Sequence, residues 1–329
     1  MTIEKKEIAM GKWIALDGGT THTRIRLMNG ERIVAEVKCP AGAGDTARTG
    51  TIATLRDAVR DGIQSVLAEG AYAAEDVAEI IASGMIGSEL GLHNVPHISG
   101  IINVTALATQ GDAVTLPEIT QIPFYFVPGV RNRPQDRLDL MRGEETECMG
   151  LMALMGASDA TCSVLLPGSH NKLVRVSRGR IMACYTAMSG EALSVIATQT
   201  LLKSALPAKW PLPMHDELLE GYRDAEQYGL MHALFHVRLM QTQMRTSADA
   251  RFSYFLGAGL AGDLKMVREF AGNGTVLVAG TDPMKTGLAD LIGTLCGNTI
   301  RLADSDTAAL ATVAGASRVR SVRAMLRKA

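Results

Sequence analysis

The chain has 329 residues, of which 47% are hydrophobic and 20% are charged, and this globular composition excludes a disordered protein. With 33 Lys and Arg against 34 Asp and Glu, the net charge is −1, which excludes the strongly basic surface of a dedicated nucleic-acid or anionic-membrane binder. The length predicts about two domains.

Cysteine usage and apolar runs indicate the compartment. The 5 cysteines are scattered and contain no CxxC pair, so we expect neither a disulfide framework nor a zinc site. No apolar run reaches the roughly 18 residues that span a bilayer, and the apolar stretch at the start of the chain is too short for a signal peptide. We therefore expect a cytoplasmic protein that does not bind membranes.

The first predicted elements form a unit that occurs twice. Residues 12–34 and residues 162–182 each read as a buried strand, a glycine turn, a second strand, a tight turn and a third strand. One constant offset in numbering matches Gly19 to Gly168 and Thr20 to Ser169, and it also aligns the apolar positions that follow. A chance match between two unrelated β-meanders is the alternative.

Helices and strands alternate after each unit. In chain order, apolar spacing predicts a helix over 51–69, strands at 77–82 and 123–127, a less regular helix over 190–206, a Gly-rich helix over 255–265, a strand at 274–279, a helix over 284–294 and a long helix from 308 to 328. This order is typical of mixed sheets covered by helices. Two such lobes would leave a cleft between them, where ligands commonly bind.

The glycine turns are the first candidate functional feature. In the turn 17–21, which reads DGGTT, glycines let backbone N–H groups approach a phosphate, and threonine hydroxyls add donors. Asp17 ends the first strand and suits a hydrated Mg²⁺ that bridges phosphate oxygens. An ordinary Gly-rich hairpin is the alternative. The equivalent turn at Gly168 and Ser169 favours the functional interpretation, because two such turns could hold a triphosphate from both sides.

Five segments, in order along most of the chain, resemble the 2-dehydro-3-deoxygalactonokinase family of the actin-like ATPase superfamily. They are residues 17–24 (DGGTTHTR), 83–88 (SGMIGS), 141–146 (MRGEET), 166–172 (LPGSHNK) and 188–191 (MSGE). The resemblance makes the two glycine turns the two phosphate segments, and makes the strand and Gly-Thr turn at 276–281 the adenosine segment.

The resemblance implies an α/β fold of two actin-like (ribonuclease H-like) lobes, each a mixed five-stranded sheet with helices. The N-terminal lobe would span 12–158, rejoined by the helix 305–329, and the C-terminal lobe 159–304. It implies an ATP- and Mg²⁺-dependent kinase that phosphorylates the 6-hydroxyl of 2-dehydro-3-deoxy-D-galactonate. The implied nucleotide-binding residues are Gly18, Gly19, Thr20, Thr21, Gly168, Ser169, His170, Gly257, Gly259, Gly280 and Thr281. For the glycines of the predicted helix 255–265, close helix packing is the alternative.

A sugar kinase needs a carboxylate that takes the proton of the attacking hydroxyl. A similar G-E-E segment carries the catalytic acid of exopolyphosphatases in the same superfamily, so Glu144 or Glu145 is the implied base. Asp17 is a rival base as well as the expected Mg²⁺ contact. The alternative is that two glutamates at a helix start only complement the helix dipole.

Substrate contacts are predicted from the same segments. A 2-keto acid carries a carboxylate, and Arg24 and Arg142 are the nearest bidentate partners. The loop Ser83, Gly84 and Met85 suits sugar contacts, and Glu191 could touch nucleotide or Mg²⁺. Each residue also has a purely structural alternative. The arginines could form surface salt bridges, the loop could be a strand-to-helix turn, and Glu191 could belong to a helix start.

Two other classes of function stay open at this point. One is a different small-molecule kinase or a polyphosphate phosphatase of the same superfamily. The other is a non-enzymatic nucleotide switch or filament protein. If the protein is the sugar acid kinase, we expect a small-molecule sugar acid as its partner, no nucleic acid, and a monomer or homodimer.

Overall fold

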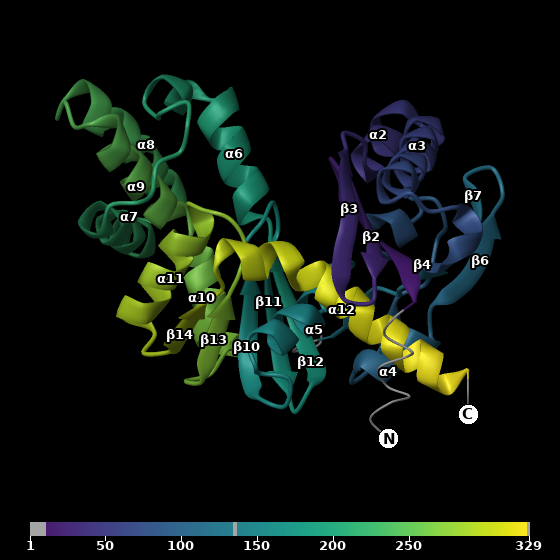
Figure 1. The fold of residues 1–329 in the computed structure, drawn as a ribbon. Helices are drawn as coiled ribbons and strands as arrows, with labels where there is room; N and C mark the ends of the chain where they lie inside the picture. Colours follow the sequence, from purple (N-terminus) through teal and green to yellow (C-terminus); the bar gives the residue numbers. More distant parts are fainter. Residues whose placement is uncertain (1–10, 134–136, 328–329) are drawn as a thin grey trace. The chain divides into compact units, whose positions relative to one another are not determined.

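The computed structural model describes residues 11–133 and 137–327 (Figure 1). The chain divides into two compact units. The first unit comprises the chain up to Ser158, the short piece Gly179–Met182 and the chain from Ala309 onward, and the second comprises Asp159–Arg178 and Ala183–Ala308.

The first unit is built on a 6-stranded sheet in the order β3-β2-β1-β4-β7-β6. Its strands are β1 (Lys12–Gly18), β2 (Thr23–Asn29), β3 (Arg32–Cys39), β4 (Val77–Gly84), β6 (Asp112–Leu116) and β7 (Thr120–Phe126). Strands β1, β2 and β3 pair antiparallel, and β1, β4 and β7 pair parallel. Strands β1, β2, β3, β4 and β7 are the five that the sequence predicted. Strand β6 is an additional strand, which pairs antiparallel with β7 at the edge of the sheet.

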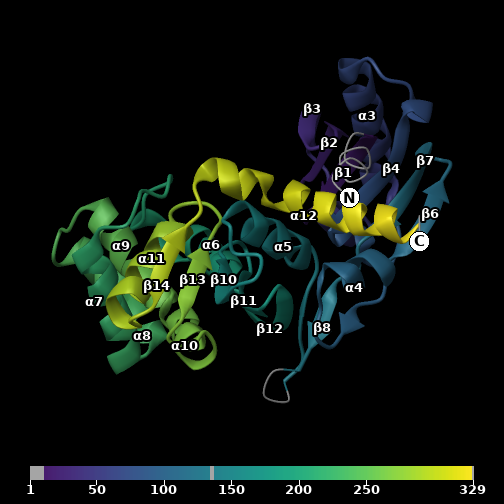
Figure 2. The same ribbon diagram turned by 60° about the horizontal axis from the view of Figure 1, so that its bottom comes forward.

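Helices cover both faces of this sheet (Figure 2). They are α2 (Ala43–Thr49), α3 (Ala53–Gly70), α4 (Val104–Thr109), α5 (Glu144–Leu154) and most of α12 (Ser305–Leu326). Ile25 of β2 packs against Gly62 of α3, whereas the next residue, Arg26, donates to the Ala309 carbonyl of α12 at 2.9 Å. Because neighbouring strand residues point to opposite faces, α3 and α12 lie on opposite faces.

Helix α12 is held to this unit by glycines and by charge. Gly150 of α5 and Gly315 of α12 have no side chains where the two helix backbones approach each other. Toward its end, Arg323 and Arg327 pair with the buried Glu79 at 3.4 and 3.2 Å. Short elements complete the unit: η1 (Ala74–Asp76), η2 (Met85–Gly87) and a 3-stranded sheet of β5 (Ile98–Ser99), β8 (Val130–Asn132) and β9 (Asp139–Met141).

The second unit is built on a 5-stranded sheet in the order β12-β11-β10-β13-β14. Its strands are β10 (Thr161–Leu166), β11 (Asn171–Ser177), β12 (Arg180–Ala187), β13 (Thr275–Val278) and β14 (Thr299–Leu302). This order matches β3-β2-β1-β4-β7 of the first unit strand by strand, so the predicted duplication is confirmed. The predicted α/β class, with mixed sheets and helices in each unit, is confirmed with it.

The tight turns of the two repeats differ in detail. The first hairpin turns at Gly30 (φ 61) and Glu31, the two residues between β2 and β3. The second turns at Arg178 (φ 51) and Gly179 (φ 69), and two left-handed residues are typical of the turns that match strand twist. Both repeats therefore reverse within two residues.

The helices of the second unit depart from the prediction in two places. They are α6 (Ser189–Gln199), η4 (Leu201–Ser204), α7 (His215–Tyr228), α8 (Leu230–Thr242), α9 (Ala248–Gly259), α10 (Ala261–Phe270) and α11 (Met284–Leu295). The predicted helix 190–206 stops early because Thr200 is extended and its hydroxyl accepts from the N–H of Leu202. The predicted Gly-rich helix 255–265 is the junction of two helices at Leu260. Figure 1 shows α7, α8 and α9 together in green.

The sequence predicts no membrane-spanning segment and no disulfide framework. Within residues 11–133 and 137–327, no helix combines the length and apolar character needed to cross a bilayer. The cysteines are free thiols, four of them buried.

Candidate active site

The first glycine turn is held from behind by the start of α2. The N–H of Gly19 donates to the carbonyl of His22 at 2.9 Å, and the N–H groups of Ala43 and Gly44 donate to the carbonyls of Gly19 and Thr20 at 3.1 and 2.8 Å. These bonds fix the turn's backbone, while the side chains of Thr20 and Thr21 stay exposed. The turn can therefore offer hydroxyl groups to a ligand without being disordered itself.

Asp17 lies at the end of β1, opposite Ser83 of β4 and Arg24 of β2. Burial raises the pKa of its carboxyl, the charges of Arg24 and Arg26 lower it, and the charge of Glu144 raises it further. Both arginines also pair with Glu36, Arg26 at 2.5 Å and Arg24 at 3.5 Å. Arg24 lies beside Asp17 and forms a salt bridge with Glu36, as the structural alternative for this residue predicted.

The start of α5 separates the two glutamates that the sequence could not separate. The Glu145 side chain is fully buried, both its carboxyl oxygens accept from the N–H of Gly143 at 3.0 and 2.8 Å, and the Thr146 hydroxyl donates to it at 3.2 Å. Burial and the neighbouring Glu144 raise its pKa to about 8. Glu144 is partly exposed and accepts from the N–H of Arg142 at 2.9 Å. The geometry favours Glu144 as the base and gives Glu145 a capping role.

A third acid of the same helix, Glu147, was missed by the sequence reasoning. Burial, followed by the charges of Asp17, Glu144 and Glu145, raises its pKa to about 8. It stands three residues after Glu144, a spacing that puts both side chains on one helix face, so the E-x-x-E spacing could have revealed it. Among the described residues, no three His, Cys, Asp or Glu side chains form a metal-binding group, and a water-mediated Mg²⁺ at Asp17 stays a prediction.

Three glycines bring the backbones of this site together. A Cβ on Gly84 would overlap the Gly18 carbonyl, and a Cβ on Gly143 would lie 3.0 Å from the Cα of Gly84. Gly84 and Gly143 have φ values of 87 and 107, which favour glycine. Gly84 therefore serves close backbone contact at the end of β4, a role that differs from the sugar contact predicted for it. Met85, the next residue, is partly exposed.

Two predicted substrate contacts face the interior instead. The Arg142 guanidinium donates to the carbonyls of Gly87 and Val95 at 2.6 and 2.7 Å, so it anchors the loop after β4 and is not presented to a substrate carboxylate. The Ser83 side chain is buried beside a water-sized cavity that Asp17 and Arg24 also line. These positions argue against direct sugar contact by either residue.

The second glycine turn lies on the start of α6. The N–H of Gly168 donates to the Asn171 side chain at 3.1 Å, and the N–H of Glu191 donates to the Ser169 carbonyl at 2.8 Å. The exposed side chains of His170 and Glu191 meet at 2.9 Å. Glu191 is thus tied to the turn itself, and any contact with nucleotide would include its histidine partner.

A buried acid from a distant helix supports this turn. Asp263 of α10 is fully buried, and it accepts from the Asn171 amide at 2.8 Å and from the Ser189 hydroxyl. Burial raises the pKa of its carboxyl, and the two side-chain hydrogen bonds lower it. One side chain therefore connects the start of β11 with the start of α6. No local pattern could have revealed it, because Asn171 and Asp263 are 92 residues apart.

A cavity of about 600 Å³ opens beside the second turn. Its walls are residues 167–169, three residues of α6 (Gly190, Ser194 and Thr198), residues 208–210 and residues 281–284. It brings the predicted Gly168, Ser169 and Thr281 to one space, whose volume suits a nucleotide-sized ligand. Gly280 adjoins this wall with φ 108, and a Cβ there would lie 2.7 Å from the Pro167 carbonyl.

The two glycines of α9 do not line this cavity. Gly257 lies where α9 crosses α7, and a Cβ there would overlap the Leu218 carbonyl. Gly259 packs against the side chain of Leu193. Their positions support the helix-packing alternative and argue against the predicted nucleotide contacts.

The duplicated sheets define the fold class of the protein, which is actin-like. The family model for 2-keto-3-deoxy-galactonokinase matches residues 17–316, and the chain belongs to that family. The resemblance drawn from the sequence motifs is confirmed.

Two curated relatives and one solved structure are similar over most of the chain. A candidate 2-dehydro-3-deoxygalactonokinase from Rhizobium meliloti (strain 1021) is 29% identical and covers 94% of this chain and 97% of its own length. The 2-dehydro-3-deoxygalactonokinase of Escherichia coli (strain K12) is 25% identical over 82% of this chain and 86% of its own. The crystal structure of a candidate 2-dehydro-3-deoxygalactonokinase from Sinorhizobium meliloti has a TM-score of 0.76 at 24% identity, and covers 93% of this chain and 97% of that one.

Proposed function

We propose that the protein transfers the γ-phosphoryl group of ATP to the 6-hydroxyl of 2-dehydro-3-deoxy-D-galactonate. The family and the name of the Escherichia coli relative support this substrate. The observation that carries ATP use is the cavity of about 600 Å³ where the second glycine turn meets the Thr281 segment.

The nucleotide would lie with its phosphates at the second turn, where Ser169 offers an exposed hydroxyl and Asn171 fixes the backbone at Gly168. In the first turn, Gly18 to Thr21, the exposed hydroxyls of Thr20 and Thr21 are the predicted phosphate donors. That both turns hold one triphosphate stays a prediction.

Mg²⁺ would contact Asp17 through water rather than through a set of protein ligands. The described residues form no three-ligand metal group, so the ion would keep waters and phosphate oxygens as most of its ligands, as Mg²⁺ commonly does. When bound, the ion neutralises negative charge that develops on the phosphates. The raised pKa of Asp17, caused mainly by burial, is consistent with a carboxylate that gains from a nearby cation.

Glu144 would act as the general base. As the substrate's 6-oxygen forms its bond to the γ-phosphorus, the bond from that phosphorus to the β–γ bridging oxygen breaks and ADP leaves with the electron pair. The hydroxyl proton passes to the Glu144 carboxylate. Arg24, beside Asp17, is the remaining candidate of the predicted pair for the substrate carboxylate, because the Arg142 guanidinium donates to loop carbonyls.

The test is a coupled assay of ADP formation with 2-dehydro-3-deoxygalactonate, its gluconate epimer, other sugar acids and water as acceptors. We expect the galactonate derivative to give the highest kcat/KM, and phosphorus–proton NMR of the product to place the phosphate on carbon 6. Preference for another sugar acid, or phosphate release from polyphosphate without an acceptor, would replace this proposal. Nucleotide-dependent light scattering without turnover would indicate a filament protein.

The free thiols of the described residues are consistent with a reducing compartment such as the cytoplasm. We expect a monomer or a homodimer, which size-exclusion chromatography with light scattering would distinguish.

A further inference from the structure

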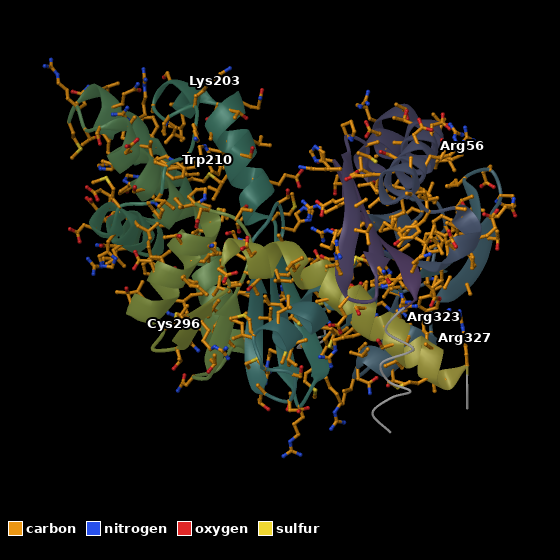
Figure 3. The ribbon with its side chains drawn as sticks, in the orientation of Figure 1. Arg56, Lys203, Trp210, Cys296, Arg323 and Arg327 are labelled. Carbon is orange, nitrogen blue, oxygen red and sulfur yellow. The ribbon has the colours of Figure 1, made fainter. Side chains whose placement is uncertain are left out.

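The segment between η4 and α7 contains none of the family motifs, yet it forms one wall of the nucleotide-sized cavity. Ala208, Lys209 and Trp210 line that cavity from this segment. Figure 3 labels Trp210 on the chain that follows α6 and η4. The wall contributed by residues 281–284 comes from the loop after β13 and the first residue of α11.

This segment is anchored at both of its ends to α9. At its start, the Ala205 carbonyl accepts from Nε of Arg251 at 2.6 Å. At its end, the N–H of Met214 donates to the Ser253 hydroxyl at 2.9 Å. A wall fixed at both ends is already ordered before a ligand arrives, so binding loses little entropy to ordering it.

Trp210 itself is held by aromatic packing. Its ring lies 5.3 Å from that of Phe252, at an interplanar angle of 42°, and Phe252 is fully buried in α9. Trp210 stays partly exposed and borders the cavity. One side of the indole is therefore fixed by the core while part of its surface faces the ligand space.

We infer that Trp210 stacks on the base of the bound nucleotide, and that residues 205–214 form the base-side wall of its site. The inference rests on the proposed use of ATP. The glycine turn supplies polar donors that suit phosphate, whereas the indole supplies a flat apolar face that suits a nucleobase. Stacking is tolerant of base identity, and its strength grows with ring area. Purine nucleotides should thus bind more tightly than pyrimidine nucleotides.

The protein carries its own optical reporter for this contact. It has 2 tryptophans, and Trp13 is fully buried in the other unit with its indole N–H donating to the Gly30 carbonyl at 2.8 Å. Titration with ADP should change the tryptophan emission of the wild-type protein and reduce its quenching by acrylamide. In the variant Trp210→Phe both changes should disappear, because only Trp13 then emits. An undiminished change in that variant would overturn the inference.

Affinity separates stacking from a general loss of structure. Calorimetry with ADP and with inorganic tripolyphosphate, which has no base, should show Trp210→Ala weakening ADP at least tenfold and tripolyphosphate by less than twofold. Trp210→Phe keeps a stacking surface and should stay within about threefold of wild type for ADP. The matched control is Leu212→Ala, because Leu212 is 61% exposed in the same segment and does not line the cavity.

The outcomes distinguish this inference from the proposed function. Equal weakening of ADP and tripolyphosphate by Trp210→Ala, or no weakening of either, overturns the role of Trp210 even if the wild-type enzyme phosphorylates the sugar acid. Selective weakening of ADP in a protein that phosphorylates no sugar acid supports the stacking and contradicts the kinase activity. No binding of ADP to the wild-type protein contradicts both.

Discussion

The two glycine turns share a backbone design but differ in charge. In the first unit the strand before the turn ends in Asp17, with Glu144 and Glu147 as acidic neighbours. In the second unit the offset that aligns Gly19 with Gly168 puts Leu166 at the position of Asp17. The comparison teaches that the duplicated fold repeats the turn, whereas the carboxylates predicted to take part in catalysis lie beside the first copy.

The second unit does have acids near its turn, but in a different environment: the exposed Glu191 is paired with His170, and Asp263 is enclosed. Asp263 is fully buried and receives hydrogen bonds from Asn171 and Ser189, whereas Asp17 and Glu144 are partly exposed. A buried carboxylate that already has its donors holds structure in place, whereas a partly exposed one can meet a ligand. Substitutions in the two units should therefore change different kinetic constants.

The largest effect is expected at Glu144. If Glu144 is the base, Glu144→Gln should lower kcat by about 10²–10⁴-fold, the usual contribution of general base catalysis. Glu145→Gln is the matched control: the Glu145 carboxyl has a pKa of about 8 and is protonated at neutral pH, so an amide resembles it. Steady-state assays should show a near-normal kcat for this control. Full rates in both variants would place the base elsewhere.

Asp17→Asn should have the next largest effect. Loss of a carboxylate that acts on Mg²⁺ through water should lower activity by about 10–100-fold. The apparent Mg²⁺ requirement should shift to higher concentration, which a titration of Mg²⁺ at saturating ATP would measure. Circular dichroism should show an unchanged fold. Wild-type turnover with a wild-type Mg²⁺ profile would remove Asp17 from the mechanism.

Asp263→Ala should act on nucleotide binding and on stability. It leaves the buried Asn171 amide and the Ser189 hydroxyl without their acceptor, which costs about 1–3 kcal/mol of unfolding free energy. Because Asn171 also holds the N–H of Gly168, the KM for ATP should rise while kcat falls less. Asp263→Asn keeps an acceptor oxygen and should restore most of both properties. An unchanged KM for ATP in the alanine variant would show that the turn does not depend on Asp263.

The smallest effect is a pH-dependent shift in stability at Glu147. Its pKa rises from an ordinary value of 4.5 to about 8 on folding, so the folded protein keeps a proton that the unfolded chain loses. The free energy of unfolding therefore falls as pH rises through this window. Glu147→Gln removes that fall, so the Tm of the variant relative to wild type should be higher at pH 8.5 than at pH 4.5.

Thermal unfolding across this pH range measures the shift. Glu75→Gln, at an exposed position of η1, is the control and should show no pH-dependent difference. A Tm difference for Glu147→Gln that is the same at both pH values would mean that Glu147 ionises normally in the folded protein.

Sequence reasoning reached the features that local patterns encode. Gly turns between alternating apolar runs predicted both β-β-β units, and the helical spacing of Leu55, Val59 and Ile63 predicted α3. The family motifs indicated the phosphate turns and the start of α5. Each of these signals lies within a few residues, where turn geometry and side-chain periodicity dominate.

What the sequence missed depends on tertiary contacts. Asp263 supports a turn that lies 92 residues earlier, and Trp210 reaches the cavity from a segment with no motif. Arg142 looked available to substrate until the structure placed its guanidinium against the carbonyls of Gly87 and Val95. Adjacent Glu144 and Glu145 are indistinguishable by spacing, and only burial separates them.

The stack of Gly18, Gly84 and Gly143 has a consequence for how this enzyme tolerates change. A methyl group on Gly143 would lie 3.0 Å from the Cα of Gly84, so the start of α5, which carries Glu144, would have to move away from the end of β4. Chemistry that needs near-contact alignment is sensitive to such displacements. In a saturation mutagenesis screen, these three positions should reject every substitution as firmly as Glu144 itself, although none of them carries a reactive group.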